Sequence, residues 1–467
     1  MGDGPRRYSF HPLEKRGLLL GLDAAQLLTL TAGLAAALVV GDAVPGPGGV
    51  AVATCLLGAA TCGALWPKGG RPLVTWFPSA AGWLTRRAHG PAISREPLGG
   101  GALKPAGLDL IELPAEPGQS PLGVIRDRRS GTWAAVMPVR GRSFSLLDPE
   151  QQIQRLDAWR TVLAALARPE SRVKRVQWVE RSAPYGGDRL GDGLRMPTAC
   201  EQTGWRAQAS YAELVAGVAP RTQTHEVWIA LSVDASRGRL GHSRRPGEEV
   251  RRELRLLEGQ LCHADLRPGP PLGLSRLQSV LAGLHRTRGP GSLIRRATPP
   301  WPMASDETWS AFRTDESWHA TYWIAEWPRI EVTPDFLTPL LIGGGRRTVS
   351  VTMAAVPADR AMREVRSART ADLADSELRE RAGFLPSARR VKEADGVTRR
   401  ESELAEGHAE FRFSGYVTVS APDKDGLDAA SAEAEHAAQE AHVELRRLFG
   451  RQAEAFAWTL PLARGLA

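Results

Sequence analysis

Two long apolar stretches lie close together near the start of the 467-residue chain. Residues 24–40 and residues 50–66 contain no charged side chain. A helix rises about 1.5 Å per residue, so each stretch would be about 25 Å long, near the lower limit for crossing a bilayer of about 30 Å. Pro45 and Pro47 stand between the stretches and prevent one continuous helix. The pattern predicts two membrane-spanning helices that form a hairpin.

Two alternatives compete with this prediction. A cleaved signal peptide would explain the first stretch, but a second stretch follows within ten residues and no clear small-residue cleavage pattern separates them. A pair of buried core helices in a soluble protein is the other alternative, because seventeen residues is short for a membrane span. At the start of the first stretch, Asp23 and Gln26 have the spacing of a capping box, which places Asp23 at the helix end rather than inside the membrane.

Basic residues predict the orientation of the hairpin. The connecting loop has no Lys or Arg, whereas basic residues flank both ends, and by the positive-inside rule both ends face the cytoplasm. About 400 residues after the hairpin would then lie inside the cell, which predicts a multi-pass protein of the inner (cytoplasmic) membrane with both termini cytoplasmic. The flanking basic residues are Arg6, Arg7, Lys15 and Arg16 before the hairpin, and Lys68, Arg71, Arg86 and Arg87 after it.

Small and aromatic residues predict how this segment packs and where the bilayer surface lies. Small residues recur every four positions in both stretches, a spacing that lets membrane helices approach closely. Residues 71–88 predict an amphipathic helix at the membrane interface, or alternatively a soluble helix that docks on the following domain. The predicted helix-packing residues are Ala25, Thr29, Gly33 and Ala37 with Ala51, Cys55, Ala59 and Gly63, and the predicted interface residues are Trp66, Trp76, Phe77, Trp83, Arg86 and Arg87.

The rest of the chain predicts an α+β fold in two similar halves. Period-two alternation predicts strands, and period-3.6 patterns predict helices between them. Because both halves follow the order strand, strand, helix, strand, helix, strand, we expect two ferredoxin-like α+β subdomains. The expected strands are residues 122–127, 132–139, 173–179, 226–233, 319–326, 348–354 and 410–420, and the expected helices are residues 149–167, 205–215, 248–263, 272–285, 358–405 (interrupted near 383–386) and 427–449.

Changes in composition set the expected domain boundaries. Pro- and Gly-rich sequence without periodicity predicts linkers after the membrane segment and between the two halves. We therefore expect residues 1–88 to form the hairpin and interfacial helix, 89–121 a linker, 122–286 the first cytoplasmic subdomain, 287–304 a second linker, and 305–467 the second subdomain.

The sequence shows no recognisable catalytic, nucleotide-binding or metal-binding motif. The chain is 42% hydrophobic and has four Cys, which excludes a disordered protein and a disulfide scaffold. The nearest match to a phosphate-binding loop, residues 343–348, has the wrong spacing and no Lys, and residues 423–426 lack the ligand spacing of a calcium loop. Residues 388–400 mix acids with bases, so direct nucleic-acid contact is not predicted. We predict no catalytic, cofactor or metal site, and no enzyme.

Several motifs resemble a known family. The opening YSFHPLEKRGLLLGL, the stretch GVIRDRRSGTWAAVMPVRGRSFSLLDPEQQ, and the later GHAEFRFSGYVTVSA and RLFGRQAEAFAWTLPLARGL resemble an actinobacterial family of integral membrane proteins with a PrgI-like N-terminus. The cytoplasmic part is similar in order to the N-terminal, non-motor domain of the TraC-type ATPases of type IV secretion. In those ATPases a nucleotide-binding domain follows, whereas this sequence stops soon after Leu460, Pro461 and Leu462.

The resemblance implies a non-enzymatic subunit of a type IV secretion or conjugation apparatus. Its expected partners are the lipid bilayer, a separately encoded P-loop ATPase that it anchors and docks, and other membrane subunits or further copies of itself. One alternative is an EccE-like membrane component of type VII secretion, which also combines two N-terminal spans with a cytoplasmic domain. Another is a membrane-tethered enzyme of unrecognised chemistry.

Overall fold

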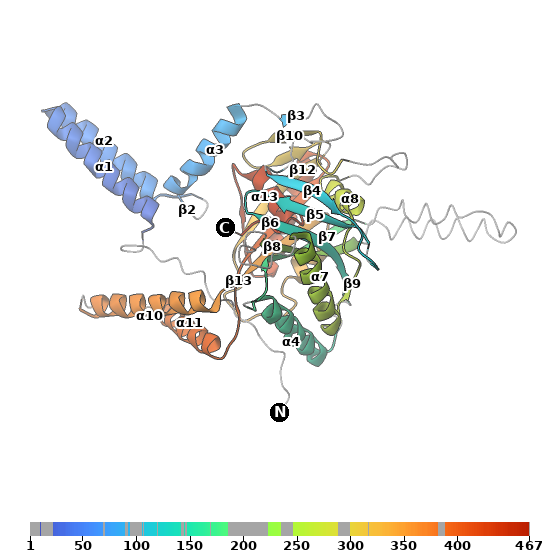
Figure 1. Cartoon of the computed structure of the whole chain (residues 1–467). Coiled ribbons are helices and arrows are strands. Elements are labelled where there is room, and N and C mark those ends of the chain that lie inside the picture. Colours follow the sequence, from blue (N-terminus) through green and yellow to red (C-terminus); the bar gives the residue numbers. More distant parts are fainter. Residues whose placement is uncertain are drawn as a thin grey trace. The chain divides into compact units, whose positions relative to one another are not determined.

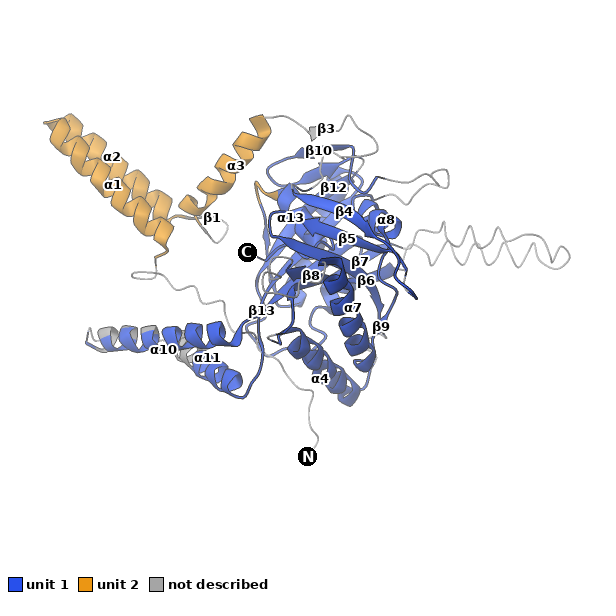
Figure 2. Cartoon of the chain, in the orientation of Figure 1, with its two compact units in different colours: residues 1–12, 91–448, 452–467 blue, residues 13–90, 449–451 orange. Residues whose placement is uncertain are grey.

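The chain forms two contact units. The computed structural model describes residues 10, 22–68, 71–88, 92–93, 105, 107–118, 120–141, 144, 147–168, 170–184, 223–234, 246–287, 299–315, 317–381 and 388–466. One unit, here called the helical unit, contains Leu13–Gly90 with Phe449–Arg451. The other, here called the sheet unit, contains Met1–Pro12, Pro91–Leu448 and Gln452–Ala467 (Figure 2).

The helical unit begins with the two predicted apolar helices. Helix α1 runs three residues beyond the charge-free stretch, and α2 begins at Pro47, which suits a first helical turn because proline has no N–H to donate. A short 3₁₀ turn and an amphipathic helix follow. The elements are α1 (Ala24–Ala43), α2 (Pro47–Leu65), β1 (Pro67–Lys68), β2 (Arg71–Pro72), η1 (Leu73–Trp76) and α3 (Phe77–Ala88).

The sheet unit is a mixed α+β structure built on one antiparallel sheet (Figure 1). Its strands are β3 (Ala92–Ile93), β4 (Leu108–Leu113), β5 (Leu122–Asp127), β6 (Thr132–Arg140), β7 (Val173–Pro184), β8 (Gln223–Asp234), β9 (Arg267–Pro268), β10 (Ala304–Glu307), β11 (Phe312–Thr314), β12 (Ser317–Glu326), β13 (Arg346–Val356), β14 (Glu410–Ala421) and β15 (Glu444–Arg447). Its helices are α4 (Pro149–Leu166), α7 (Pro246–His263), α8 (Leu274–Leu284), α9 (Thr338–Ile342), α10 (Ala358–Arg381), α11 (Ala388–Ala405), α12 (Lys424–Glu440) and α13 (Gln452–Thr459).

The two halves of the sheet repeat the same strand order. Strands β4, β5 and β6 form a meander, and β8 then lies between β6 and β7. In the second half β10, β11 and β12 form a meander, and β14 lies between β12 and β13. The short strand β9 pairs with β6, as β15 pairs with β12. The halves join where β7 pairs with β13 along seven residue pairs, so one sheet continues through both.

Helices cover both faces of this sheet. Neighbouring residues in a strand point to opposite faces, and Ala134 and Ala135 of β6 accordingly belong to different hydrophobic cores. On one face α4 and α7 cover the first half, and α9 and α12 cover the second. On the other face α8 and α13 share a core that includes Leu281 and Phe456 and contains residues from both halves.

Two predicted boundaries differ from the structure. Residues 108–113 were expected in a linker but form β4, because Leu108 is buried beneath α8 and the strand pairs with β5. The last predicted helix, 427–449, ends at Glu440, since His442 has a left-handed backbone (φ 55°) and the amide of Val443 donates to the carbonyl of Ala438. The chain then forms β15. The helix expected at 205–215 lies outside the described residues.

The polar side of β13 is buried rather than solvent-exposed. Thr348, Ser350 and Thr352 alternate with apolar residues, which predicts a half-buried strand, yet all three are buried. The covering segment is Trp458–Leu466, here called the C-terminal strap. Ser350 Oγ donates to the carbonyl of Trp458 at 3.1 Å, and Thr352 Oγ1 donates to that of Arg464 at 2.7 Å.

Gln177 of β7 contacts this strap through both atoms of its side-chain amide. The two N–H groups of its Nε2 are shared among three acceptors, the carbonyls of Trp458 (2.8 Å) and Leu460 (3.0 Å) and Ser350 Oγ (2.8 Å). Its Oε1 accepts from the amide of Ala463 at 2.6 Å. Since β7 belongs to the first half of the sheet and β13 to the second, the strap fastens the two halves together.

An ion pair holds the strap to β5 as well. Arg464 Nε donates to Asp127 Oδ2 at 2.9 Å. Burial would raise the pKa of the Asp127 carboxyl, but the charge and hydrogen bonds of Arg464, together with hydrogen bonds from Ser130 and Arg129, hold it below its usual value. The carboxylate therefore stays charged and keeps its bond to the strap over the neutral pH range.

Two histidines in the shared core are neutral at neutral pH. Burial lowers the pKa of His285 to about 4 and that of His319 to about 3. The ring nitrogens of His319 lie 2.8 Å from Thr314 Oγ1 and 2.8 Å from Ser420 Oγ, so the imidazole links β11 to β14. His319 thus lies within a strand, as predicted, and serves the packing of that core.

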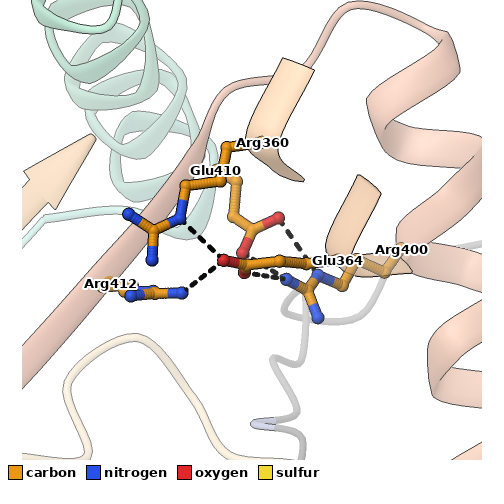
Figure 3. Close-up of polar contacts among 5 residues, drawn as sticks. All are labelled: Arg360, Glu364, Arg400, Glu410 and Arg412. Atoms are coloured by element: carbon orange, nitrogen blue, oxygen red, sulfur yellow. Dashed lines mark hydrogen bonds and ion pairs between the residues drawn. The ribbon is translucent and has the colours of Figure 1, made fainter. Parts of the chain in front are cut away.

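An ion network fixes the base of the α10–α11 helix pair (Figure 3). The Glu364 carboxylate of α10 forms ion pairs with Arg360 and with Arg412 of β14, with N···O distances of 2.8 and 2.7 Å. Arg400 of α11 forms an ion pair with Glu410. The hydrogen bond from Arg360, with a smaller opposing effect of burial, leaves the Glu364 pKa below its usual value. The apolar core between the two helices is small, so this network supplies part of what orients them.

Candidate membrane segment

Helices α1 and α2 pack against each other in opposite directions. Gln26, near the start of α1, donates through Nε2 to the carbonyl of Ala64, near the end of α2, at 2.8 Å. The same side chain accepts from the amide of Asp23 at 2.8 Å, so one residue both caps α1 and ties it to α2. At Gly33 a Cβ would lie 2.2 Å from the Cβ of Ala60, so the helices approach more closely there than a larger residue allows.

The predicted packing residues of α1 divide between the contact and the surface. Ala37 is buried, and Thr29 and Gly33 are half-buried, which suits the predicted stripe. Ala25 is exposed, and Gln26 is buried instead. Thr29 Oγ1 donates to the carbonyl of Ala25 within the same helix, so its hydroxyl is satisfied without a partner helix.

Three of the four predicted packing residues of α2 do not face α1. Ala51, Cys55 and Ala59 are exposed, and only Gly63 is half-buried. Other small residues of α2 lie at the contact with α1: Gly49 and Ala64 are buried, and Ala53 and Ala60 are half-buried. α2 carries two stripes of small residues, and the spacing alone does not say which of them faces α1.

The large apolar side chains of the helical unit are left unburied. Of the nineteen exposed large apolar residues among those described, thirteen lie in α1, α2, α3 and the short connections between them. Both α1 and α2 are long and apolar enough to cross a membrane, and only 6% and 11% of their most apolar windows are buried. A core helix of a soluble protein has most of its apolar surface covered. The two helices therefore indicate association with a membrane.

The predicted interface residues gather around η1 and α3. Trp66 follows α2 and is 63% exposed, and Phe77 is 74% exposed. The Trp76 ring lies 5.7 Å from that of Phe449, which belongs to the same unit. The Arg87 guanidinium lies over the Trp83 ring at 5.0 Å.

Helix α3 is amphipathic. It has no buried residue, and Arg86 and Arg87 lie in its last turn, where positive charge favours the helix dipole. Arg86 also donates to the carbonyl of Gly450, within the helical unit. An exposed helix with aromatic and basic residues fits either an interfacial position or a docked helix, the two alternatives that the sequence left open.

The other chemical motifs remain structural. Residues 343–345 form the turn between α9 and β13, and the Asp423 carboxylate accepts from the Gly426 amide as the N-cap of α12. Among the described residues no group of three or more His, Cys, Asp or Glu side chains could hold a metal ion. No protein-family model matches this chain, and no curated protein matches it.

Substituting Gly33 with Leu should separate α1 from α2. The new Cβ alone would collide with Ala60, and detergent or lipid offers no hydrophobic gain to hold the pair together. We expect the detergent-solubilised chain to aggregate at a temperature several degrees lower. Gly58→Leu is the matched control, because nothing lies within 4 Å of the Cβ position at Gly58. Equal aggregation temperatures for the two variants would contradict the close contact between α1 and α2 at Gly33.

Proposed function

We propose that this chain is a non-enzymatic inner-membrane subunit of a type IV secretion-like apparatus, which anchors and docks a separately encoded ATPase. One observation carries the proposal: two adjacent helices that leave their apolar sides uncovered are joined to a large sheet unit. The helices would cross the membrane as a hairpin with both termini in the cytoplasm. The sheet unit would then lie at the cytoplasmic surface, in reach of a partner ATPase.

The architecture of the sheet unit supports a docking role. Among the described elements the first half follows the order β-α-β-β-α-β, and the second half follows it with α10 and α11 inserted between β13 and β14. The neighbouring strands are β9-β6-β8-β7 and β15-β12-β14-β13, the arrangement expected of a ferredoxin-like unit. We therefore propose two ferredoxin-like units fused edge to edge through β7 and β13. A body of this size offers room for a standard interface of about 1,600 Å², which a pair of membrane helices cannot provide alone.

Co-purification tests the docking role. The full chain, crosslinked in native membranes and purified in detergent, is expected to bring with it a P-loop ATPase in a fixed ratio. Gln439→Ala, on an exposed position of α12, should recover as much ATPase as the unsubstituted chain. The absence of any P-loop partner would contradict the proposal. Recovery of a four-domain FtsK-like ATPase instead would favour the type VII alternative.

A further inference from the structure

An aromatic patch lies on the sheet unit beside the end of β12. It consists of Trp327, which follows β12 directly, Phe336, which precedes α9, and Phe413 of β14. The Trp327 ring is edge-on to both other rings, with centroids 6.3 Å from Phe336 and 5.2 Å from Phe413. Gly415 of β14 leaves room for the indole, because a Cβ there would lie 2.9 Å from Trp327 Cζ2. The backbone of β14 thus helps to shape the patch.

Phe10, far away in the sequence, packs on this patch. Its ring stacks on that of Trp327 with centroids 5.4 Å apart and an interplanar angle of 29°, and it tilts against Phe336 at 5.4 Å. These are favourable separations for aromatic pairs. Phe10 is half-buried, and contacts group Met1–Pro12 with the sheet unit.

The patch lies at the edge of a hydrophobic core, because Trp327 and Phe336 pack against the core formed with α9 and α12. Phe413 keeps 42% of its surface exposed, although its ring meets that of Trp327. The cores on either side of the sheet do not include Phe413 or Phe10. The aromatic residue that packs on this edge of the core therefore comes from a part of the chain that is far away in the sequence.

We propose that the aromatic patch is the docking site for the chain's own N-terminal segment, with Phe10 as the anchoring side chain. After α1, α2 and α3 in the sequence, Ala92 and Ile93 of β3 pair with β10 of the same sheet. The sheet unit therefore contacts the chain both before the membrane segment in sequence, at Phe10, and after it, at β3. The docking contact stands by itself, but its role in fixing a membrane anchor rests on the proposed function.

Photocrosslinking tests the contact directly. The full chain is made with p-benzoylphenylalanine at position 10, irradiated in membranes, digested and analysed by mass spectrometry. We expect crosslinks to peptides that contain Trp327, Phe336 or Phe413. A mixture of isotopically light and heavy chains separates links within one chain from links between copies. Links to the patch of another copy, or only to lipid or other peptides, would overturn the proposal.

Limited trypsin digestion tests whether Phe10 anchors the segment. We expect Phe10→Ala to speed cleavage at the basic residues that flank position 10 by roughly five- to tenfold, since two aromatic pairs are lost. Phe10→Trp should retain protection, and Leu256→Ala, which removes another exposed apolar side chain, should leave the rate unchanged. If Phe10→Ala behaves like Leu256→Ala, the anchor does not exist. The Phe10→Ala and Leu256→Ala variants should both stay in the membrane fraction. Loss of the Phe10 contact therefore gives a different result from a wrong membrane assignment.

Discussion

Replacing Gln177 with Ala should lower the stability of the sheet unit by about 3 to 5 kcal/mol. Gln177 is fully buried, and its loss leaves the amide of Ala463 without its side-chain partner. The carbonyls of Trp458 and Leu460 each lose one of two hydrogen bonds. An unsatisfied buried polar group costs about 1 to 3 kcal/mol. The apparent melting temperature of the detergent-solubilised chain should fall by about 5 to 10 °C.

Two further variants define what this result means. Gln439→Ala removes the same amide from an exposed position of α12 and should leave the melting temperature unchanged. Thr352→Val removes only the bond to the carbonyl of Arg464 and should have a smaller effect, about 1 kcal/mol. If the Gln177→Ala variant has the same melting temperature as the Gln439→Ala control, the strap does not fasten the two halves of the sheet.

Regular periodicity made much of the fold predictable. The absence of charge over residues 24–40 and 50–66 indicated two apolar helices, because apolar runs close to twenty residues are typical of membrane-spanning helices. Strands β5, β6, β12 and β13 followed from their alternation, and α7 and α8 from their apolar stripes. Repetition of this pattern in both halves anticipated the repeated strand order.

Features set by tertiary contact were not predictable in the same way. The end of α12 depends on a left-handed backbone at His442, where the sequence has no glycine to mark it. The strap is too short to show a period, so the covering of Ser350 and Thr352 left no signal in the sequence. The contact of Phe10 with Trp327 spans more than 300 residues, and local patterns carry no information over that distance.

The membrane segment shows the same division. The sequence correctly predicted α1 and α2 as helices, and it placed Gly33 and Ala37 on the packing side. It did not identify the side of α2 that faces α1, because Ala51, Cys55 and Ala59 form as good a stripe of small residues as Gly49, Ala53 and Ala60. Gln26 was the missed signal: an amide inside an apolar helix needs a hydrogen-bond partner, and Ala64 supplies it.

Fractionation of cell membranes tests the central claim most directly. The full chain is expected in the pellet of a high-speed spin, resistant to high salt and alkaline carbonate and released only by detergent, because two apolar helices lose several kcal/mol each on leaving lipid. A variant that lacks residues 22–66 should move to the supernatant. A full chain that stays in the supernatant without detergent, or a shortened chain that still resists salt and carbonate, would contradict the claim that α1 and α2 anchor this protein.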